Sequence, residues 1–174
     1  MEIRTERLTL RPLEKSDWQF VQRLGKDFES GPMRNYDGIH AVSEDDAQEQ
    51  TRLYMEAGLF WIVMRTGFPV GMVNFYPAGD SYDLGYCFLS SVKGKGYARE
   101  SCHALLAHYE ANGVTRFTAG TALDNQPSVR LLLHLGFRLT GTERLWMRKD
   151  GEGRKIWFDG GQFELNASSG YPKS

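Results

Sequence analysis

The sequence has little of what marks secreted, membrane-bound or zinc-dependent proteins. Its two cysteines, Cys87 and Cys102, are too few for a disulfide scaffold and have no metal-ligand spacing to the four histidines. Charged residues interrupt the N-terminal segment, and no later apolar run reaches the roughly 18 residues that a membrane-spanning helix needs. These absences predict a cytoplasmic protein with no metal site and no membrane partner.

Net charge is also nearly absent. The 21 basic residues balance 22 acidic ones, which leaves a formal charge of −1. This balance predicts no nucleic-acid partner, and it predicts no acidic funnel that would attract a polycationic acceptor. The length of 174 residues favours one compact domain, which we place at residues 1–166, before a polar tail at residues 167–174. We expect a monomer or a homodimer.

Hydrophobic spacing predicts alternating strands and helices. Period-two patterns predict strands at residues 8–11, 59–65, 68–76, 82–89, 114–123, 137–148 and 155–165. Helical spacing predicts helices at residues 16–28, 43–58, 98–113 and 124–136, with Ser16 as the N-cap of the first. The irregular stretch at residues 29–42 is a candidate binding loop. The order of elements indicates an α/β fold with a mixed, mostly antiparallel sheet and flanking helices.

A glycine-rich segment joins a strand to a helix at residues 93–98. Gly94 and Gly96 allow close approach of a ligand to the backbone, and Lys93 and Lys95 add positive charge beside a helix N-terminus. This arrangement suits a pyrophosphate, although a solvated turn with two lysines explains it equally well. A Walker loop and a dinucleotide-binding loop both fit poorly, because Tyr97 follows the second glycine and the strands before it look antiparallel. A nucleotide-binding protein stays as an alternative.

Further motifs accompany this loop along almost the whole chain. They are Thr5-Glu6-Arg7-Leu8-x-Leu10-Arg11, Asp83-Leu84-Gly85-Tyr86, Lys93-Gly94-Lys95-Gly96-Tyr97-Ala98, Asn125-x-x-Ser128-x-Arg130-Leu131, Leu135-Gly136-Phe137 and Trp157-x-Asp159. In order and spacing they resemble the GNAT family of N-acetyltransferases, and within it the branch that acetylates the N-termini of ribosomal proteins. Lys93 stands where the family's acyl-CoA loop has glutamine or arginine.

The resemblance implies a GNAT fold whose sheet is splayed in the middle, with acetyl-CoA as co-substrate. The pantetheine arm of the co-substrate is expected to enter the opening like an added strand and to bond the backbone near Phe88, Leu89 and Ser90. The pyrophosphate is expected on Lys93, Gly94, Lys95, Gly96, Tyr97 and Ala98. Asn125 and Ser128 are expected to contact the co-substrate near its thioester.

Acetyl transfer to an amine needs a base for the amine proton and an acid for the departing thiolate. The resemblance points to Asp83 as the base, acting through water; the alternative is an exposed carboxylate at a strand edge. It points to Ser128 for the acid role, either donating through its hydroxyl or holding a water, because Leu132 stands where many relatives have a tyrosine. The alternative for Ser128 is a helix first-turn residue that bonds a backbone N–H. No base is placed to activate either cysteine, so no covalent acyl-enzyme is expected.

The acceptor is expected at Met33, Arg34, Tyr36 and His40 in the irregular loop, since relatives bind their acceptors there. Trp146 and Trp157 of the last hairpin either form the opposite wall or belong to the core. The function that follows is direct acetyl transfer to a primary amine, either a protein N-terminus or a small molecule. The alternative is a CoA-binding regulatory module without turnover.

Overall fold

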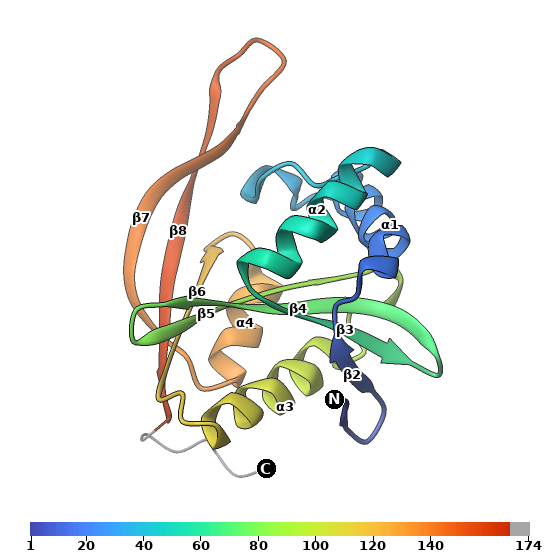
Figure 1. Ribbon diagram of the computed structural model, residues 1–174. Coiled ribbons are helices and arrows are strands. Elements are labelled where there is room, and N and C mark those ends of the chain that lie inside the picture. Colours follow the sequence, from blue (N-terminus) through green and yellow to red (C-terminus); the bar gives the residue numbers. More distant parts are fainter. Residues whose placement is uncertain (168–174) are drawn as a thin grey trace.

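The computed structural model describes residues 1–167, within which eight strands form one sheet (Figure 1). The strand order is β1-β2-β3-β4-β5-β6-β8-β7, and all neighbours are antiparallel except β5 and β6. This confirms the predicted α/β class and the mostly antiparallel sheet. No helix in this part of the chain is long and apolar enough to cross a membrane. The predicted tail lies, from residue 168 on, outside the described residues.

The elements follow the predicted order with small shifts at their ends. The strands are β1 (Ile3–Arg4), β2 (Thr9–Pro12), β3 (Leu59–Arg65), β4 (Phe68–Ala78), β5 (Ser81–Phe88), β6 (Arg116–Ala122), β7 (Arg138–Lys149) and β8 (Lys155–Asn166). The helices are α1 (Trp18–Glu29), α2 (Glu44–Ala57), α3 (Tyr97–Ala111) and α4 (Gln126–His134).

Polar side chains fix where the helices begin. Ser43 caps α2 by accepting a hydrogen bond from the backbone N–H of Asp46 at 3.1 Å. The predicted cap of α1 by Ser16 is wrong. A short 3₁₀ turn, Lys15–Asp17, precedes this helix, and Asp17 is drawn away from capping because it bonds both guanidinium nitrogens of Arg11.

The helices cover both faces of the sheet, with α1 and α2 on one side and α3 and α4 on the other (Figure 1). Each side buries its own apolar cluster. One cluster contains Phe20, Val21 and Leu24 of α1. The larger cluster packs α3 and α4 against the other face and includes Leu105, Leu106, Leu132 and Leu135. Burial of these apolar side chains stabilises the fold by roughly 25 cal/mol for each Å² of apolar surface removed from water.

The sheet is splayed at its centre. The parallel ladder between β5 and β6 contains two pairs, Tyr82 with Phe117 and Asp83 with Thr118. Beyond Asp83, β5 pairs only with β4, while β6 continues alongside β8 as far as Ala122. The predicted opening in the middle of the sheet is therefore confirmed.

Close backbone packing joins α1 to the loop between α1 and α2. A Cβ atom at Gly25 would lie 2.1 Å from the backbone oxygen of Ala41, far inside van der Waals contact. We therefore expect Gly25→Ala to lower the free energy of unfolding by about 1–3 kcal/mol through overpacking. Helix propensity alone has the opposite sign, because alanine is favoured over glycine by about 1 kcal/mol in a helix.

Urea denaturation of Gly25→Ala measures which effect dominates. The matched control is Gly38→Ala in the same loop, where an added Cβ meets nothing within 4 Å. The control should unfold at the wild-type midpoint. A Gly25→Ala protein as stable as wild type would show that α1 and the loop do not pack this closely.

Candidate active site

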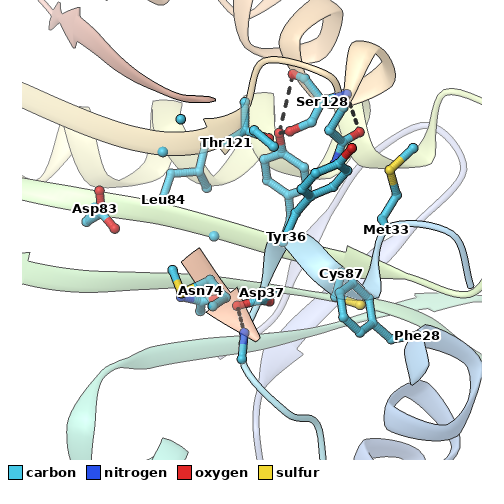
Figure 2. Close-up of a pocket in the computed structure, with 18 of the residues that line it drawn as sticks. Phe28, Met33, Tyr36, Asp37, Asn74, Asp83, Leu84, Cys87, Thr121 and Ser128 are labelled. Atoms are coloured by element: carbon cyan, nitrogen blue, oxygen red, sulfur yellow. Dashed lines mark hydrogen bonds between the residues drawn. The ribbon is translucent and has the colours of Figure 1, made fainter. Parts of the chain in front are cut away.

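A cleft of about 620 Å³ opens where β5 and β6 part. Its floor is made by residues 83–87 of β5 and by Gly120, Thr121 and Ala122 of β6. Residues 36–40 form another wall, and the β7–β8 hairpin forms the side opposite β5. Because strands from both halves of the sheet contribute backbone here, the shape of the cleft follows directly from the splay. Figure 2 shows the arrangement of its side chains.

Asp83 lies in the floor of the cleft. It is half-buried and stands between β4 and β6 rather than at an exposed edge. The hydroxyl of Thr118 donates a hydrogen bond of 2.7 Å to its Oδ1. Burial raises the pKa of this carboxyl above its usual value, and the bond from Thr118 opposes that effect. A carboxylate with a raised pKa beside a cleft has the properties of a general base.

Ser128 and Asn125 lie at the start of α4, above the opening between the strands. Asn125 caps the helix, because its side-chain oxygen accepts from the backbone N–H of Ser128 at 3.4 Å. The hydroxyl of Ser128 instead lies 2.5 Å from the hydroxyl of Tyr86 on β5. Asn125, and not Ser128, is therefore the residue that caps α4 with its side chain. The Ser128 hydroxyl is turned to the cleft side. Both residues line the cleft.

Three of the four predicted acceptor residues line the cleft. Met33, Tyr36 and His40 reach it from the irregular loop. Arg34 does not line it, because its guanidinium turns back to the carbonyl of Glu29 at 3.4 Å. The ring of His40 stacks on Phe28 with centroids 4.1 Å apart.

The wall opposite β5 is made by the inner face of the hairpin. Leu145, Met147 and Phe158 line the cleft there. Trp146 and Trp157 do not, and they pair with each other across the strands. Side chains that follow one another along a strand point to opposite faces, which is why the neighbours of these tryptophans face the cleft.

An ion pair missed by the sequence analysis fastens the loop to the hairpin. Arg148 on β7 bonds both carboxylate oxygens of Glu29 at 2.7 Å, and it also donates to the carbonyls of Asp37 and Gly38. The Arg148 guanidinium lowers the pKa of Glu29 to about 2. The two residues are 119 positions apart, and neither belongs to a motif of the resemblance. No local signal in the sequence identifies the pair.

The glycine-rich loop has the conformation that its sequence predicts. Gly94 and Gly96 have φ angles of 79° and 80°, in the left-handed region that favours glycine. Gly96 is the N-cap of α3, and no side chain caps this helix. The first backbone N–H groups of α3 therefore point out of the helix end without a side-chain acceptor from the cap position. This end can hold an anion.

The backbone near the end of β5 is partly engaged already. Leu89 N donates to Val70 O at 3.0 Å, and Ser90 N donates to the carboxylate of Asp27 at 2.8 Å. Neighbouring residues of a strand turn their backbone groups to opposite sides, so Phe88 directs its N–H and C=O towards the β6 side. Of the three predicted backbone contacts, Phe88 is the one oriented into the opening.

The side chain of Tyr97 has a structural role. It is 5% exposed and lies beneath the guanidinium groups of Arg7 and Arg65, at 4.9 and 5.4 Å from the ring centroid. Arg7 also bonds the carbonyl of Lys95 and the carboxylate of Glu100. The N-terminal segment thus supports the glycine loop, and Tyr97 can offer a ligand only its backbone.

The ionisable groups in the cleft are mainly acidic. Asp37, Asp83 and Glu143 line it, and no lysine or arginine does so among the described residues. Tyr76 lies within electrostatic reach of both aspartates, since each contributes to the rise in its pKa after the larger effect of burial. The balanced net charge of the sequence concealed this local excess.

Comparisons with known proteins agree with this geometry. A model of the acetyltransferase (GNAT) domain matches residues 7–138. YnaD, an uncharacterized N-acetyltransferase of Bacillus subtilis strain 168, is 27% identical over 164 residues, or 91% of this chain and 93% of that protein. A GNAT-family acetyltransferase from Bacillus anthracis has a TM-score of 0.80 at 24% identity, over 97% of this chain and 99% of that one.

A further solved structure has the same fold. RimL, described as a ribosomal L7/L12 alpha-N-protein acetyltransferase in complex with coenzyme A, has a TM-score of 0.83 at 18% identity. The match covers 98% of this chain and 100% of that one. The domain model spans well over half of the sequence. The splayed sheet, the glycine loop and these matches together show that the chain belongs to the GNAT family of acetyltransferases.

Proposed function

We propose that this acetyltransferase moves an acetyl group from acetyl-CoA directly to a primary amine, without a covalent acyl-enzyme. The observation that carries the proposal is the cleft at the splay. It places the half-buried carboxylate of Asp83 and the hydroxyl of Ser128 around an opening of about 620 Å³. The acceptor is a small-molecule amine or the N-terminal amine of a protein.

The glycine loop and the end of β5 suit acetyl-CoA. The pyrophosphate rests on the backbone of residues 94–98, where Gly94 and Gly96 place no Cβ in the way and α3 presents its positive end. The pantetheine extends along Phe88 in the position of a missing strand. The complex of RimL with coenzyme A supports this assignment.

Asp83 accepts the proton of the amine through water. An amine of pKa roughly 8–10 is mostly protonated at neutral pH and must lose a proton before it can attack. The raised pKa of Asp83 makes it a stronger base than an ordinary aspartate. Ser128 donates to the departing thiolate. Cys87 also lines the cleft, but burial raises the pKa of its thiol to about 12, so it is no nucleophile at neutral pH.

The charges of the cleft favour a cationic acceptor without a carboxylate. Asp37 and Glu143 line the cleft and offer negative charge to a second cationic group. The rings of Tyr54, Phe60 and Tyr76 also line it and pack on one another. An acceptor carboxylate would meet like charge in a partly dehydrated site. Small polycationic amines fit this environment best.

A regulatory module that binds CoA without turnover is the second candidate. One observation favours it, since Leu132 is fully buried and offers no proton at the position where many relatives have a tyrosine. Acetyl-CoA binding without release of free thiol in the presence of any amine would support this candidate over the first.

Binding of acetyl-CoA tests the loop assignment. We expect Gly94→Glu to weaken binding at least tenfold, or about 1.4 kcal/mol, because it puts a negative side chain where the pyrophosphate rests. Gly79→Glu in the β4–β5 turn is the matched control, since Gly79 also has a positive φ angle and open space around it. Calorimetry should find wild-type affinity for the control. Equal binding by both variants would contradict the assignment.

The pH profile tests Asp83. Because burial raises its pKa, the acidic fall of kcat/KM should lie above the usual aspartate range, with activity lost as the carboxylate is protonated. Asp83→Asn should reduce kcat on the order of 10²-fold and abolish that fall. Thr118→Val keeps the carboxylate but removes the bond that lowers its pKa, so its acidic limb should move to higher pH. If wild type, Asp83→Asn and Thr118→Val all show the same acidic limb of kcat/KM, Asp83 is excluded as the base.

A series of acceptors with one carbon chain tests the charge preference. Butane-1,4-diamine, butylamine and 4-aminobutyrate differ only in the far group, which is cationic, neutral or anionic. We expect kcat/KM to fall in that order, by on the order of tenfold at each step. Asp37→Asn combined with Glu143→Gln should reduce the advantage of the diamine over butylamine. The reverse order in wild type would refute the preference.

A further inference from the structure

Tyr86 places a phenol beside Ser128 from the opposite side of the cleft. It lies on β5 past the last pair with β6, and its hydroxyl is 2.5 Å from Ser128 Oγ and 3.5 Å from the Ser128 carbonyl oxygen. Both side chains line the cleft. Since Asn125 caps α4, the Ser128 hydroxyl is left to pair with the phenol.

Helix α4 itself supplies no phenol at this place. Leu132, one turn beyond Ser128, is 0% exposed and packs in the core on the α3 side. A hydrocarbon side chain has no proton to give, and a serine hydroxyl alone is a very weak acid. The contact from Tyr86 connects that serine to a more acidic hydroxyl.

We propose that Tyr86 and Ser128 form a proton relay to the thiolate that leaves acetyl-CoA. In this relay Ser128 is the catalytic residue, because it is the member of the pair that gives its proton to the sulfur. Tyr86 is a positioning and proton-supplying residue that acts through Ser128. The relay rests on the proposed function and assigns the source of the proton in that reaction.

The step balances in atoms and charge. The amine lone pair forms the C–N bond, and the C–S bond breaks with its electron pair on sulfur. The Ser128 proton moves to sulfur and the Tyr86 proton moves to Ser128 Oγ. The proton of the amine leaves through water to Asp83 and then to solvent, and a solvent proton restores Tyr86. An amide and a free thiol are the products.

The Tyr86 phenol is held in the protonated form that a relay needs. Burial raises the pKa of the Tyr86 phenol, so the group stays protonated across the working range of pH. An ordinary thiol has a pKa of roughly 8.5, so the departing thiolate takes up a proton at neutral pH.

Removal of one hydroxyl tests the relay. We expect Tyr86→Phe to lower kcat for thiol release on the order of 10²-fold while KM for acetyl-CoA stays unchanged. Tyr82→Phe is the matched control: Tyr82 lies four residues earlier on β5, packs against the core, and is not among the residues that line the cleft. It should retain wild-type kcat. Full activity in Tyr86→Phe would overturn the relay.

A double-mutant cycle separates a relay from a packing role. If the two hydroxyls act in series, Ser128→Ala already breaks the chain, and adding Tyr86→Phe should cost less than twofold more. Independent packing roles predict that the two losses multiply. Multiplied losses would refute the relay even if each single variant is slow.

Replacement of Tyr86 by 2,3,5-trifluorotyrosine gives a readout that packing does not move. Fluorination makes the phenol more acidic, so the fluorinated phenol loses its proton at lower pH than tyrosine does. The relay therefore predicts that kcat falls on the alkaline side at lower pH than in wild type. An unchanged alkaline limb would contradict the relay. Thiol release is followed with amine and with water as acceptor, because the thiolate leaves in both. If the wild-type protein releases thiol with water as acceptor but with none of the amines, the proposed function is refuted. The variants described above then decide the relay from their rates of thiol release with water.

Discussion

The short ladder between β5 and β6 is the constraint on which the site depends. Two residue pairs hold the halves of the sheet together, and past Asp83 the strands diverge. Backbone groups of β5 that face the gap lose a strand partner, which is costly unless water or a ligand replaces it. The same divergence makes room for the cleft and brings the start of α4 over it. The opening proposed for the donor and the cavity proposed for the acceptor thus have one structural cause.

The C-terminal end of α1 links the two ends of this opening. Asp27 bonds the backbone and hydroxyl of Ser90, where β5 turns towards the glycine loop. Glu29, two residues later, holds Arg148 of the hairpin and so fixes the loop at residues 36–40 over the cleft. An ion pair joined by two hydrogen bonds fixes the orientation of the two side chains as well as the distance between them. Through this helix the glycine loop and the hairpin side of the cleft are held at a fixed distance from each other.

Most of the fold could be predicted from the sequence, because strand and helix periods, cap residues and turn glycines are local signals. The glycine loop and the proposed roles of Asp83 and Ser128 came from motifs recognised by their order and spacing in the sequence. One cap prediction was wrong: Ser16 does not cap α1, and the side chain of Asp17 before the helix bonds Arg11. Two predicted site residues have side chains with other partners, since Arg34 donates to the carbonyl of Glu29 and the ring of Tyr97 lies under Arg7.

The family, the order of elements and the loop suited to a pyrophosphate can be recognised in the sequence alone, since each depends on neighbours in the chain. Which groups meet across the splay depends on the tertiary structure. Tyr86 reaches Ser128 over 42 positions, and three carboxylates collect in one cleft of a chain whose net charge is −1. Neither result is encoded locally, because long-range contacts are set by how the sheet is ordered and where it parts. The chemistry of the cleft is therefore a property of the fold.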